Sequence, residues 1–328
     1  MARRDIFAIG ASAGGIAALR RLASKLPSDF PGSILIVLHI SPESNGLLPQ
    51  ILANSGPLPA KNAAHNEPVL PGQIYVAPPN QHLLVSASGA IQISHGPKEN
   101  RFRPAIDPLF RSVALAYTHR AAGIILSGAL DDGTSGLCAI KRQGGLSIVQ
   151  DPGEAEVPSM PQSALRHVGA DYCLPIDGIA GLLPRLAREA QAPTETQDPA
   201  HMPDDIMREV EIAADETSSI SLQHLTEPSR FTCPECSGSL FNVQDSAVSR
   251  FRCHTGHAFT LSSLEAELRG SIEQTSWAAI RVLQEHAMLL TEAAALPETT
   301  AESKSMFIDK AESALRKARL IRTTLLEA

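Results

Sequence analysis

The sequence lacks any apolar run near the roughly 20 residues that a membrane-spanning helix needs. Its longest, Ile34 to Ile40, has the length of a strand. The chain also lacks an excess of positive charge, because 28 Lys and Arg face 35 Asp and Glu and the net charge is −7. This balance disfavours a nucleic-acid-binding surface or an anionic-membrane surface, since the average field attracts neither polyanion.

Cysteine is scarce, with five in 328 residues. Cys138 and Cys173 are isolated in apolar surroundings, which indicates inert core thiols, whereas the other three lie together with histidines. The basic start of the chain is followed by only a short apolar segment and then Gly10, which makes a poor secretory signal. We therefore expect a cytoplasmic protein without a disulfide framework.

The first 190 residues alternate short β-rich runs with amphipathic helical patterns, which is typical of parallel strands joined by crossover helices. This pattern predicts an α/β fold with a doubly wound, mostly parallel sheet. Strands are predicted at Ile6–Ile9, Ile34–His39, Gly123–Leu126, Ser147–Val149 and Asp171–Leu174, and helices at Ile16–Lys25, Asp107–Tyr117, Ser135–Gln143 and Gln162–Val168. Turn residues punctuate Val69–Ser94, where a β-hairpin insertion is expected.

Composition changes after this domain. Residues 191–228 carry many acids opposed only by Arg208, which indicates an acidic linker with one short helix around Asp204–Ala213. Residues 229–260 hold a Cys/His cluster, and residues 261–328 are rich in Ala, Leu and Glu with helical periodicity. The break at Leu296-Pro297 predicts two helices that form an α-hairpin.

Ser12 follows the first predicted strand in the string Gly10-Ala-Ser-Ala-Gly14, just before a helical pattern. This matches a G-x-S-x-G nucleophile elbow in its strand–turn–helix context. A phosphate-binding loop is the alternative, because small residues after a first strand also cradle phosphates. The dinucleotide fingerprint, however, needs Gly at Ser12 and an acid at the end of the second strand, where His39 stands.

His39 and the pair Asp131 and Asp132 also follow predicted strands. Active sites of open parallel sheets form at the carboxyl ends of strands, so His39 is a candidate general base. One of the two aspartates is expected to orient its imidazole. The alternatives are a surface or core histidine and a pair of acids that cap the helix near Thr134.

Five strings carry a family resemblance. They are IGASAGG at Ile9–Gly15, VLH at Val37–His39, VLPGQIYVAPPNQHL at Val69–Leu83, NRFRPAIDPLF at Asn100–Phe110 and ILSGALDDGTSGL at Ile125–Leu137. In this order, over roughly Arg4 to Leu183, the chain resembles the catalytic domain of chemotaxis protein-glutamate methylesterases (CheB). The resemblance implies hydrolysis of glutamyl methyl esters on chemoreceptor cytoplasmic helices and, in some members, deamidation of glutamine there.

The resemblance also implies roles for single residues. Ser12 would be the nucleophile, His39 the base and acid, and Asp132 the orienting carboxylate, with no cofactor required for catalysis. Two further roles are expected: backbone N–H groups of Ala13 and Ala129 would bind the oxyanion, and Arg101 and Arg103 lie in the substrate-facing loop. Solvated arginines are the alternative for the last two.

The chain departs from the family pattern in three ways. Members commonly have Thr after the nucleophile, where Ala13 stands, and Met-Gly at Ala129-Leu130. They also usually carry an N-terminal receiver domain, whereas the similarity here begins at the first residues, so we expect regulation without phosphorylation in cis.

The Cys/His cluster has C-x₂-C spacing at Cys233 and Cys236, followed, after sixteen intervening residues, by Cys253-His-Thr-Gly-His257. Two such knuckles surround one tetrahedral zinc ion. Cys233, Cys236, Cys253 and His257 are the predicted ligands, with His254 the alternative fourth, and the site is expected to be structural. The segment resembles the CPxC…RCxxGH tails of some stand-alone methylesterase-like proteins.

Two classes of function follow. The first is an active methylesterase whose partners are chemoreceptor helices or a related methylated protein. The second is a weakly active or non-catalytic scaffold that binds receptor or kinase partners. A nucleotide-binding α/β protein is a third reading, disfavoured by Ser12 and His39. Self-association through the C-terminal helices is compatible with each.

Overall fold

The computed structural model describes residues 3–189, 204–215, 226–243 and 248–327. It divides into two compact units, Met1–Leu264 and Glu265–Ala328. The predicted acidic linker falls largely outside the described residues, which include only 204–215 and 226–228 of it. Each unit is described by itself.

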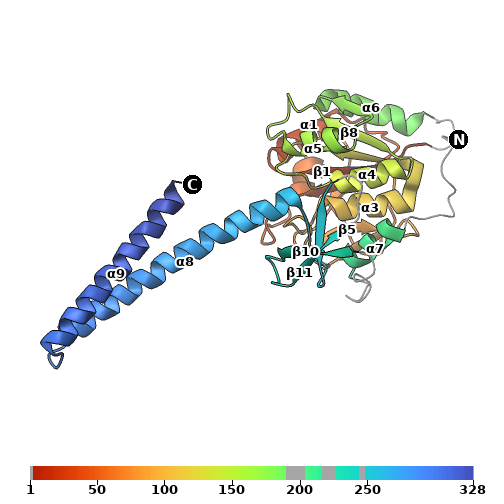
Figure 1. The fold of residues 1–328 in the computed structure, drawn as a ribbon. Helices are drawn as coiled ribbons and strands as arrows, with labels where there is room; N and C mark the ends of the chain where they lie inside the picture. Colours follow the sequence, from red (N-terminus) through yellow and green to blue (C-terminus); the bar gives the residue numbers. More distant parts are fainter. Residues whose placement is uncertain (1–2, 190–203, 216–225, 244–247, 328) are drawn as a thin grey trace. The chain divides into compact units, whose positions relative to one another are not determined.

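A seven-stranded sheet organises the first unit (Figure 1). In sheet order its strands are β3 (Ala60–Asn62), β4 (Ile74–Val76), β2 (Ser33–Leu38), β1 (Ile6–Ala11), β7 (Ala121–Ile125), β8 (Leu146–Gln150) and β9 (Tyr172–Leu174). Every neighbouring pair is parallel. The first strand therefore lies at the centre, where Ile6 pairs with Ser33 on one side and Ala121 on the other. The five predicted strands are confirmed.

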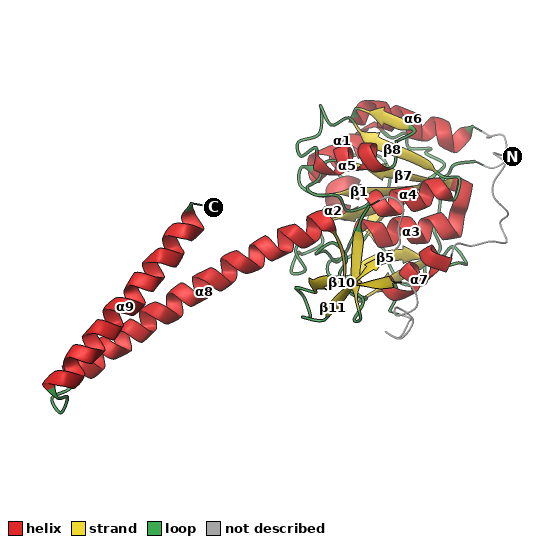
Figure 2. Cartoon of the chain, viewed as in Figure 1, coloured by secondary structure: helices red, strands yellow, loops and turns green. Residues whose placement is uncertain are grey.

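Helices cover both faces of this sheet (Figure 2). Alternate residues of β1 point to opposite faces, so Phe7 and Ile9 join one core and Ile6 and Ala8 the other. The first core includes α1 (Gly15–Lys25), α2 (Leu48–Ala53) and α6 (Ile176–Arg188); the second includes α3 (Ile106–Tyr117), α4 (Thr134–Arg142) and α5 (Ser159–His167). The predicted doubly wound arrangement is confirmed, with α2 and α6 as additional helices.

The predicted hairpin insertion forms only in the second half of Val69–Ser94. There β5 (His82–Val85) and β6 (Ile91–Ser94) make a separate antiparallel pair. The earlier run, Ile74–Val76, is instead a parallel strand of the main sheet beside β2. All three of its residues are buried, and a three-residue strand has too few positions for its pairing to be read from its own pattern.

After the main sheet, α7 (Asp204–Ala213) forms where a helix was predicted. A four-stranded antiparallel sheet then follows in the order β10 (Thr226–Thr232), β11 (Ser239–Val243), β12 (Arg250–Cys253) and β13 (Ala258–Thr260). We call these strands and their described turns the Cys/His module. Its small core is built from Leu240, Phe251, Phe259 and Leu264 with two of the cysteines.

The second unit is a helical hairpin of α8 (Leu261–Ala295), which begins in the first unit, and α9 (Ala301–Leu326). The two helices meet through Ala287, Ala311 and Ala314, and the Thr300 hydroxyl caps α9 by accepting the Ser303 N–H. This hairpin is the one that the Leu296-Pro297 break predicts. None of the described helices combines the length and apolarity that crossing a membrane requires.

A substitution at Gly10 tests how closely α3 approaches the central strand, β1. A Cβ at this position would lie 2.4 Å from the Ile106 Cγ2 atom, so Gly10→Ala is expected to push α3 away and destabilise the fold by about 1–3 kcal/mol. Gly181→Ala in α6 is the matched control, because in the described part of the chain no atom beyond its own stretch of helix lies within 4 Å of the added Cβ. It should stabilise by about 0.5–1 kcal/mol. Urea unfolding of both variants measures the difference, and equal stabilities would contradict the close approach.

Candidate active site

Ser12 lies in the tight turn between β1 and α1. Gly14 caps the helix with a left-handed φ of 75°, and a Cβ there would lie 2.6 Å from the Ser127 Oγ atom. The Ser12 N–H donates to the Ser127 carbonyl at 2.9 Å, and the Ser127 hydroxyl donates to the Ala13 carbonyl at 2.7 Å. Ser127 lies two residues after β7, the strand beside β1, so it fastens the turn to the carboxyl edge of the sheet.

His39 is the first residue after β2, and its N–H donates to the Ala11 carbonyl at the end of β1. Its ring is 2% exposed, and Nε2 lies 2.7 Å from the Asp132 Oδ2 atom. A carboxylate only accepts, so Nε2 carries the proton and Nδ1 is the basic nitrogen. Within the described part of the chain, Nδ1 has no hydrogen-bond partner. The ring stacks on Phe102, with centroids 3.6 Å apart.

Asp132 lies between β7 and α4 and is almost fully buried. Besides His39, it accepts hydrogen bonds from the Ile106 N–H at 2.7 Å and the Asn100 side-chain amide at 2.8 Å. Burial alone would raise the pKa of this carboxyl. The donors outweigh it and lower the pKa of Asp132 to about 2, so the group is a carboxylate at neutral pH.

The two adjacent aspartates have different partners. Asp131 accepts a hydrogen bond from the Thr260 hydroxyl at 2.7 Å, and burial raises its pKa. Neither acid caps α4, whose N-cap is Gly133 without a side-chain cap bond. The capping alternative is therefore wrong, because the side chain of Asp132 faces His39 and that of Asp131 faces Thr260 at the end of β13.

Ser12, His39 and Asp132 thus follow three strands that are neighbours in the sheet, β1, β2 and β7. The strands that follow β1 in sequence, β2 to β4, lie on one side of it, and β7, β8 and β9 lie on the other. The strand order therefore reverses at β1, and a crevice opens at the carboxyl end of such a strand. Two open cavities share Ser12, Ala13 and His39 in their linings. Their volumes are about 430 and 490 Å³. Ser12 and His39 therefore line the same cavities, and the Nδ1 atom of the imidazole lies buried beneath this surface.

The other predicted site residues occupy different settings. Ala13 lines both cavities, whereas Ala129 lies exposed in the loop after β7. Arg101 and Arg103 line the second cavity. The Arg103 guanidinium donates to the Asn80 side chain and to the carbonyls of His95 and Gly96, so it also holds its own loop. Substrate binding by the arginines and oxyanion binding by the alanines stay predictions.

The Cys/His module brings four side chains together. The ligand atoms of Cys233, Cys236, Cys253 and His257 all lie within 4.8 Å of one another. The Cys253 sulfur lies 3.6 Å from that of Cys236 and 3.5 Å from the His257 Nδ1 atom. These distances match the edge of a tetrahedron around zinc, about 3.8 Å for metal–sulfur bonds of about 2.3 Å. His254 is exposed and is not part of the cluster.

Comparison with known proteins identifies the family. The model of the family "CheB methylesterase" matches residues 7–183. The chain belongs to the CheB methylesterase family. This match spans the main sheet and ends before the acidic segment, so it covers Ser12, His39 and Asp132 and leaves out the Cys/His module.

Individual relatives agree with this assignment. The chain is 41% identical over 182 residues to a protein of Leptospira interrogans provisionally named a protein-glutamate methylesterase/protein-glutamine glutaminase, covering 56% of this chain and 94% of that protein. A relative with that name in Anaeromyxobacter dehalogenans is 38% identical, with 57% and 53% covered. The CheB methylesterase catalytic domain of Thermotoga maritima has a TM-score of 0.54 and 33% identity, covering 57% of this chain and 99% of that one.

Leu130 has a structural cost in this CheB family member. Its φ of 63° lies in the left-handed region, where a branched side chain costs roughly 1–2 kcal/mol relative to glycine. The resemblance noted from the sequence places a glycine at this position, which fits that backbone. In this chain leucine adopts the left-handed conformation in the loop before Asp132.

Sequence reasoning missed several residues that surround the site. Asn100 and Phe102 contact Asp132 and His39, and Ser127 fastens the Ser12 turn. His82 is fully buried, donates from Nε2 to the Pro97 carbonyl and accepts the Ala105 N–H, and burial lowers its pKa. Asn100 and His82 lie within strings that carry the family resemblance. The strings do not show which side chains meet in the folded chain, so they could not indicate the roles of these residues.

The low pKa of Asp132 predicts a specific effect of acid on stability. Its charge stabilises the fold above the ordinary aspartate pKa of 3.8, and this contribution is lost as pH falls through about 2. Asp132→Asn should therefore destabilise by on the order of 2 kcal/mol at pH 7 and by about 1 kcal/mol less at pH 3.

Denaturant unfolding at both pH values measures this change, with Asp131→Asn as the control. The pKa of Asp131 is raised, and an asparagine there can still accept the Thr260 hydroxyl, so its effect at pH 7 should be smaller. An Asp132→Asn penalty that grows on acidification would contradict the assignment of a stabilising carboxylate.

Proposed function

We propose that this chain is a protein-glutamate methylesterase in which Ser12 is the nucleophile, His39 the base and Asp132 the orienting carboxylate. The observation that carries the proposal is the state of His39. Asp132 fixes one ring nitrogen, the other is basic and without a partner among the described residues, and Ser12 lines the same two cavities. The names of the relatives support the same activity.

The reaction follows from these roles. Ser12 Oγ attacks the carbonyl carbon of a glutamyl methyl ester while His39 Nδ1 takes the hydroxyl proton. His39 then gives this proton to the departing methoxide, which leaves as methanol. Water, deprotonated by His39, hydrolyses the glutamyl-serine ester and restores the hydroxyl. Asp132 holds Nε2–H throughout and stabilises the imidazolium that forms at each step.

The substrate proposed is a methylated chemoreceptor helix or a related methylated protein in the cytoplasm. Lys98, Arg101 and Arg103 line the second cavity, and cations beside a cleft favour acidic helices. Glutamine in place of the ester would give deamidation, with ammonia leaving instead of methanol. The N–H groups of Ala13 and Ala129 are the proposed oxyanion donors.

Methanol release from a methylated receptor fragment tests the assignment. Ser12→Ala should reduce the rate by on the order of 10³-fold or more, because the covalent step is lost. Ser41→Ala is the matched control, because Ser41 also lines the second cavity. Within the described part of the chain the Ser41 hydroxyl accepts only the exposed Glu43 N–H, so the rate should stay near that of the parent. A folded parent protein that releases no more methanol than Ser12→Ala would instead support the scaffold function.

We also propose that the Cys/His module binds one structural zinc ion through Cys233, Cys236, Cys253 and His257. Three thiolates and an imidazole suit zinc, and a complete set of four protein ligands leaves no position for a reacting group. The ion would join the turn between β10 and β11 to the turn between β12 and β13. Its contribution is to the fold, in the manner of other small zinc modules.

Elemental analysis of purified protein should find one zinc per chain. His257→Ala should lower the occupancy sharply and His254→Ala should leave it unchanged, because His254 is outside the cluster. Equal loss in the two variants, or full occupancy in both, would be inconsistent with the proposed ligand set.

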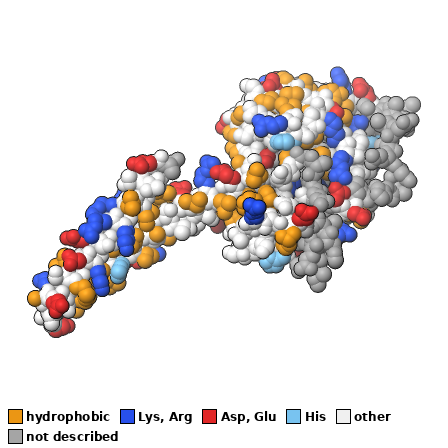
Figure 3. All heavy atoms as spheres, in the orientation of Figure 1, with side chains coloured by type: hydrophobic (Ala, Val, Ile, Leu, Met, Phe, Trp, Pro, Cys, Tyr) orange, Lys and Arg blue, Asp and Glu red, His pale blue; other side chains and the backbone are white. Residues whose placement is uncertain are grey.

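The second unit supports the earlier hypothesis of self-association. Its helices expose apolar side chains (Figure 3). Ile272, Leu289 and Leu320 are among the large ones. A two-helix hairpin buries little apolar surface by itself, so a further helical partner would cover these residues. A second copy of the hairpin is the partner proposed.

A further inference from the structure

The loop between β6 and α3 is bound on one side by the Cys/His module. The Asn100 N–H donates to the Ala258 carbonyl at 2.8 Å, and the Ala258 N–H donates to the Lys98 carbonyl at 3.2 Å. Ala258 directly follows the cluster residue His257. Residues 98–100 thus pair with the first residue of β13, and the loop continues the edge of the module's sheet.

The Asn100 side chain joins this edge to the candidate active site. Its Oδ1 accepts from the Thr260 N–H at 3.0 Å and from the Ser263 hydroxyl at 3.2 Å. Its Nδ2 donates to Asp132 Oδ1 at 2.8 Å and to Asp107 Oδ2 at 3.0 Å. The orientation of the amide is determined, because a backbone N–H can only donate and must face the oxygen.

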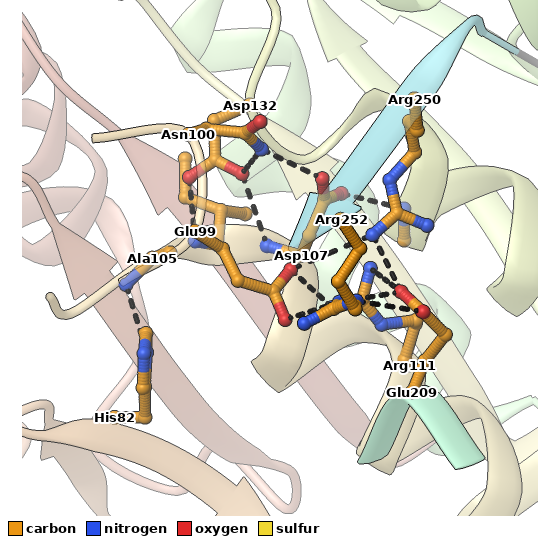
Figure 4. A network of polar contacts seen from close by, with 12 residues as sticks. His82, Glu99, Asn100, Ala105, Asp107, Arg111, Asp132, Glu209, Arg250 and Arg252 are labelled. Carbon is orange, nitrogen blue, oxygen red and sulfur yellow. Dashed lines mark hydrogen bonds and ion pairs between the residues drawn. The ribbon is translucent and has the colours of Figure 1, made fainter. Parts of the chain in front are cut away.

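A buried group of five charges holds the same loop from a second direction (Figure 4). Glu99 and Glu209 face the guanidinium groups of Arg111, Arg250 and Arg252. Arg252 Nη2 lies 2.9 Å from Glu99 and 2.7 Å from Glu209. The arginines come from α3 and from β12, beside Cys253, while Glu209 comes from α7. All five side chains are buried or nearly so.

Movement of Asn100 would disturb the contacts that hold the His39 ring. Glu99 and Phe102 exchange two backbone hydrogen bonds, at 3.1 and 2.9 Å, so the residues from 99 to 102 form one tight turn. Phe102 stacks on the His39 ring, and Asn100 binds the carboxylate that holds the same ring. Both contacts depend on the position of this turn.

We propose that Asn100 is a positioning residue through which the Cys/His module holds the Asp132–His39 pair, so that metal in the module sets the competence of the active site. The proposal rests on the proposed function. The matched segment of the family ends at residue 183, so the Thr260 and Ser263 contacts to Asn100 come from outside the shared domain. The Thr260 hydroxyl also donates to Asp131, which adds a contact between the module and the β7–α4 loop that carries Asp132.

Asn100→Ala in the full chain tests the role of the side chain. We expect kcat for ester hydrolysis to fall by about 10–100-fold with little change in KM, because the reacting groups are misplaced while the substrate cavity remains. Asn66→Ala is the matched control. Both asparagines have a left-handed backbone, with φ of 64° at Asn66 and 50° at Asn100, but the Asn66 side chain is exposed. Its kcat should stay at the parent value.

The pH profile separates positioning from a loss of stability. Loss of the Asn100 donor raises the pKa of Asp132. The acid limb of the kcat/KM profile should therefore shift to higher pH, by about 0.5–1 unit. The groups that face Asp132 are His39, Asp107, Asp131 and His82, and all remain in the variant. Ser263→Ala removes one of the two donors to Asn100 and should shift the limb less, in the same direction. An unchanged limb in both folded variants would overturn the proposal.

Zinc removal from the full chain by a chelator tests the module. Hydrogen exchange should show lost protection at the Asn100 and Thr260 amides while the amides of β1 and β7 stay protected. Labelling of Ser12 by a fluorophosphonate should slow by a factor similar to the fall in kcat, and zinc should restore both. Retained protection and labelling in zinc-free protein would overturn the proposal. If the parent releases no methanol, only the proposed function fails, because exchange and labelling still report the coupling.

Discussion

Burial of one carboxylate is the constraint on which the candidate active site depends. Asp132 is charged and nearly inaccessible, and such a group is stable only when donors surround it. Apart from the neighbouring Gly133 N–H, its donors come from three places in the chain: a histidine after β2, the start of α3 and the loop before α3. The approach of β7 to α3 and the path of the 98–103 loop are therefore fixed together with the imidazole.

The parallel sheet supplies the other half of the arrangement. The central strand pairs with β2 and β7, so the residues that follow these three strands meet at one edge although they are far apart in sequence. Ser12 is fastened to β7 through Ser127, and His39 is fastened to β1 through the Ala11 carbonyl. Backbone contacts thus determine the spacing of the serine and the imidazole, and side-chain contacts determine the ring orientation.

Much of this was accessible from the sequence, for a physical reason. The strands of the main sheet are short apolar runs, and the position of Ser12 and His39 after such runs predicted that they would share an edge. The choice between Asp131 and Asp132 needed the family resemblance, because both follow the same strand. The choice of His257 over His254 follows from the turn before β13, which turns one histidine toward the cysteines and leaves the other exposed.

The contacts of Asn100, Phe102 and Glu209 could not be predicted in this way. Each depends on residues more than 30 positions away or on another sheet, and no local period records such a pairing. Ile74–Val76 is a related case: its place beside β2 is a property of the sheet and not of three residues. The acidic segment looked like a spacer by composition, yet its Glu209 lies among buried arginines.

That placement of Glu209 affects how the chain can be dissected. A fragment that ends near residue 190 would contain the full family domain but would lack Arg250, Arg252 and Glu209. Glu99 and Arg111 would then be exposed and would lose the ion-pair partners that these three residues provide. Water would replace the Thr260 and Ser263 partners of Asn100. The smallest autonomous piece of this protein is therefore expected to extend past β13 to the first turn of α8, well beyond the boundary that homology alone suggests.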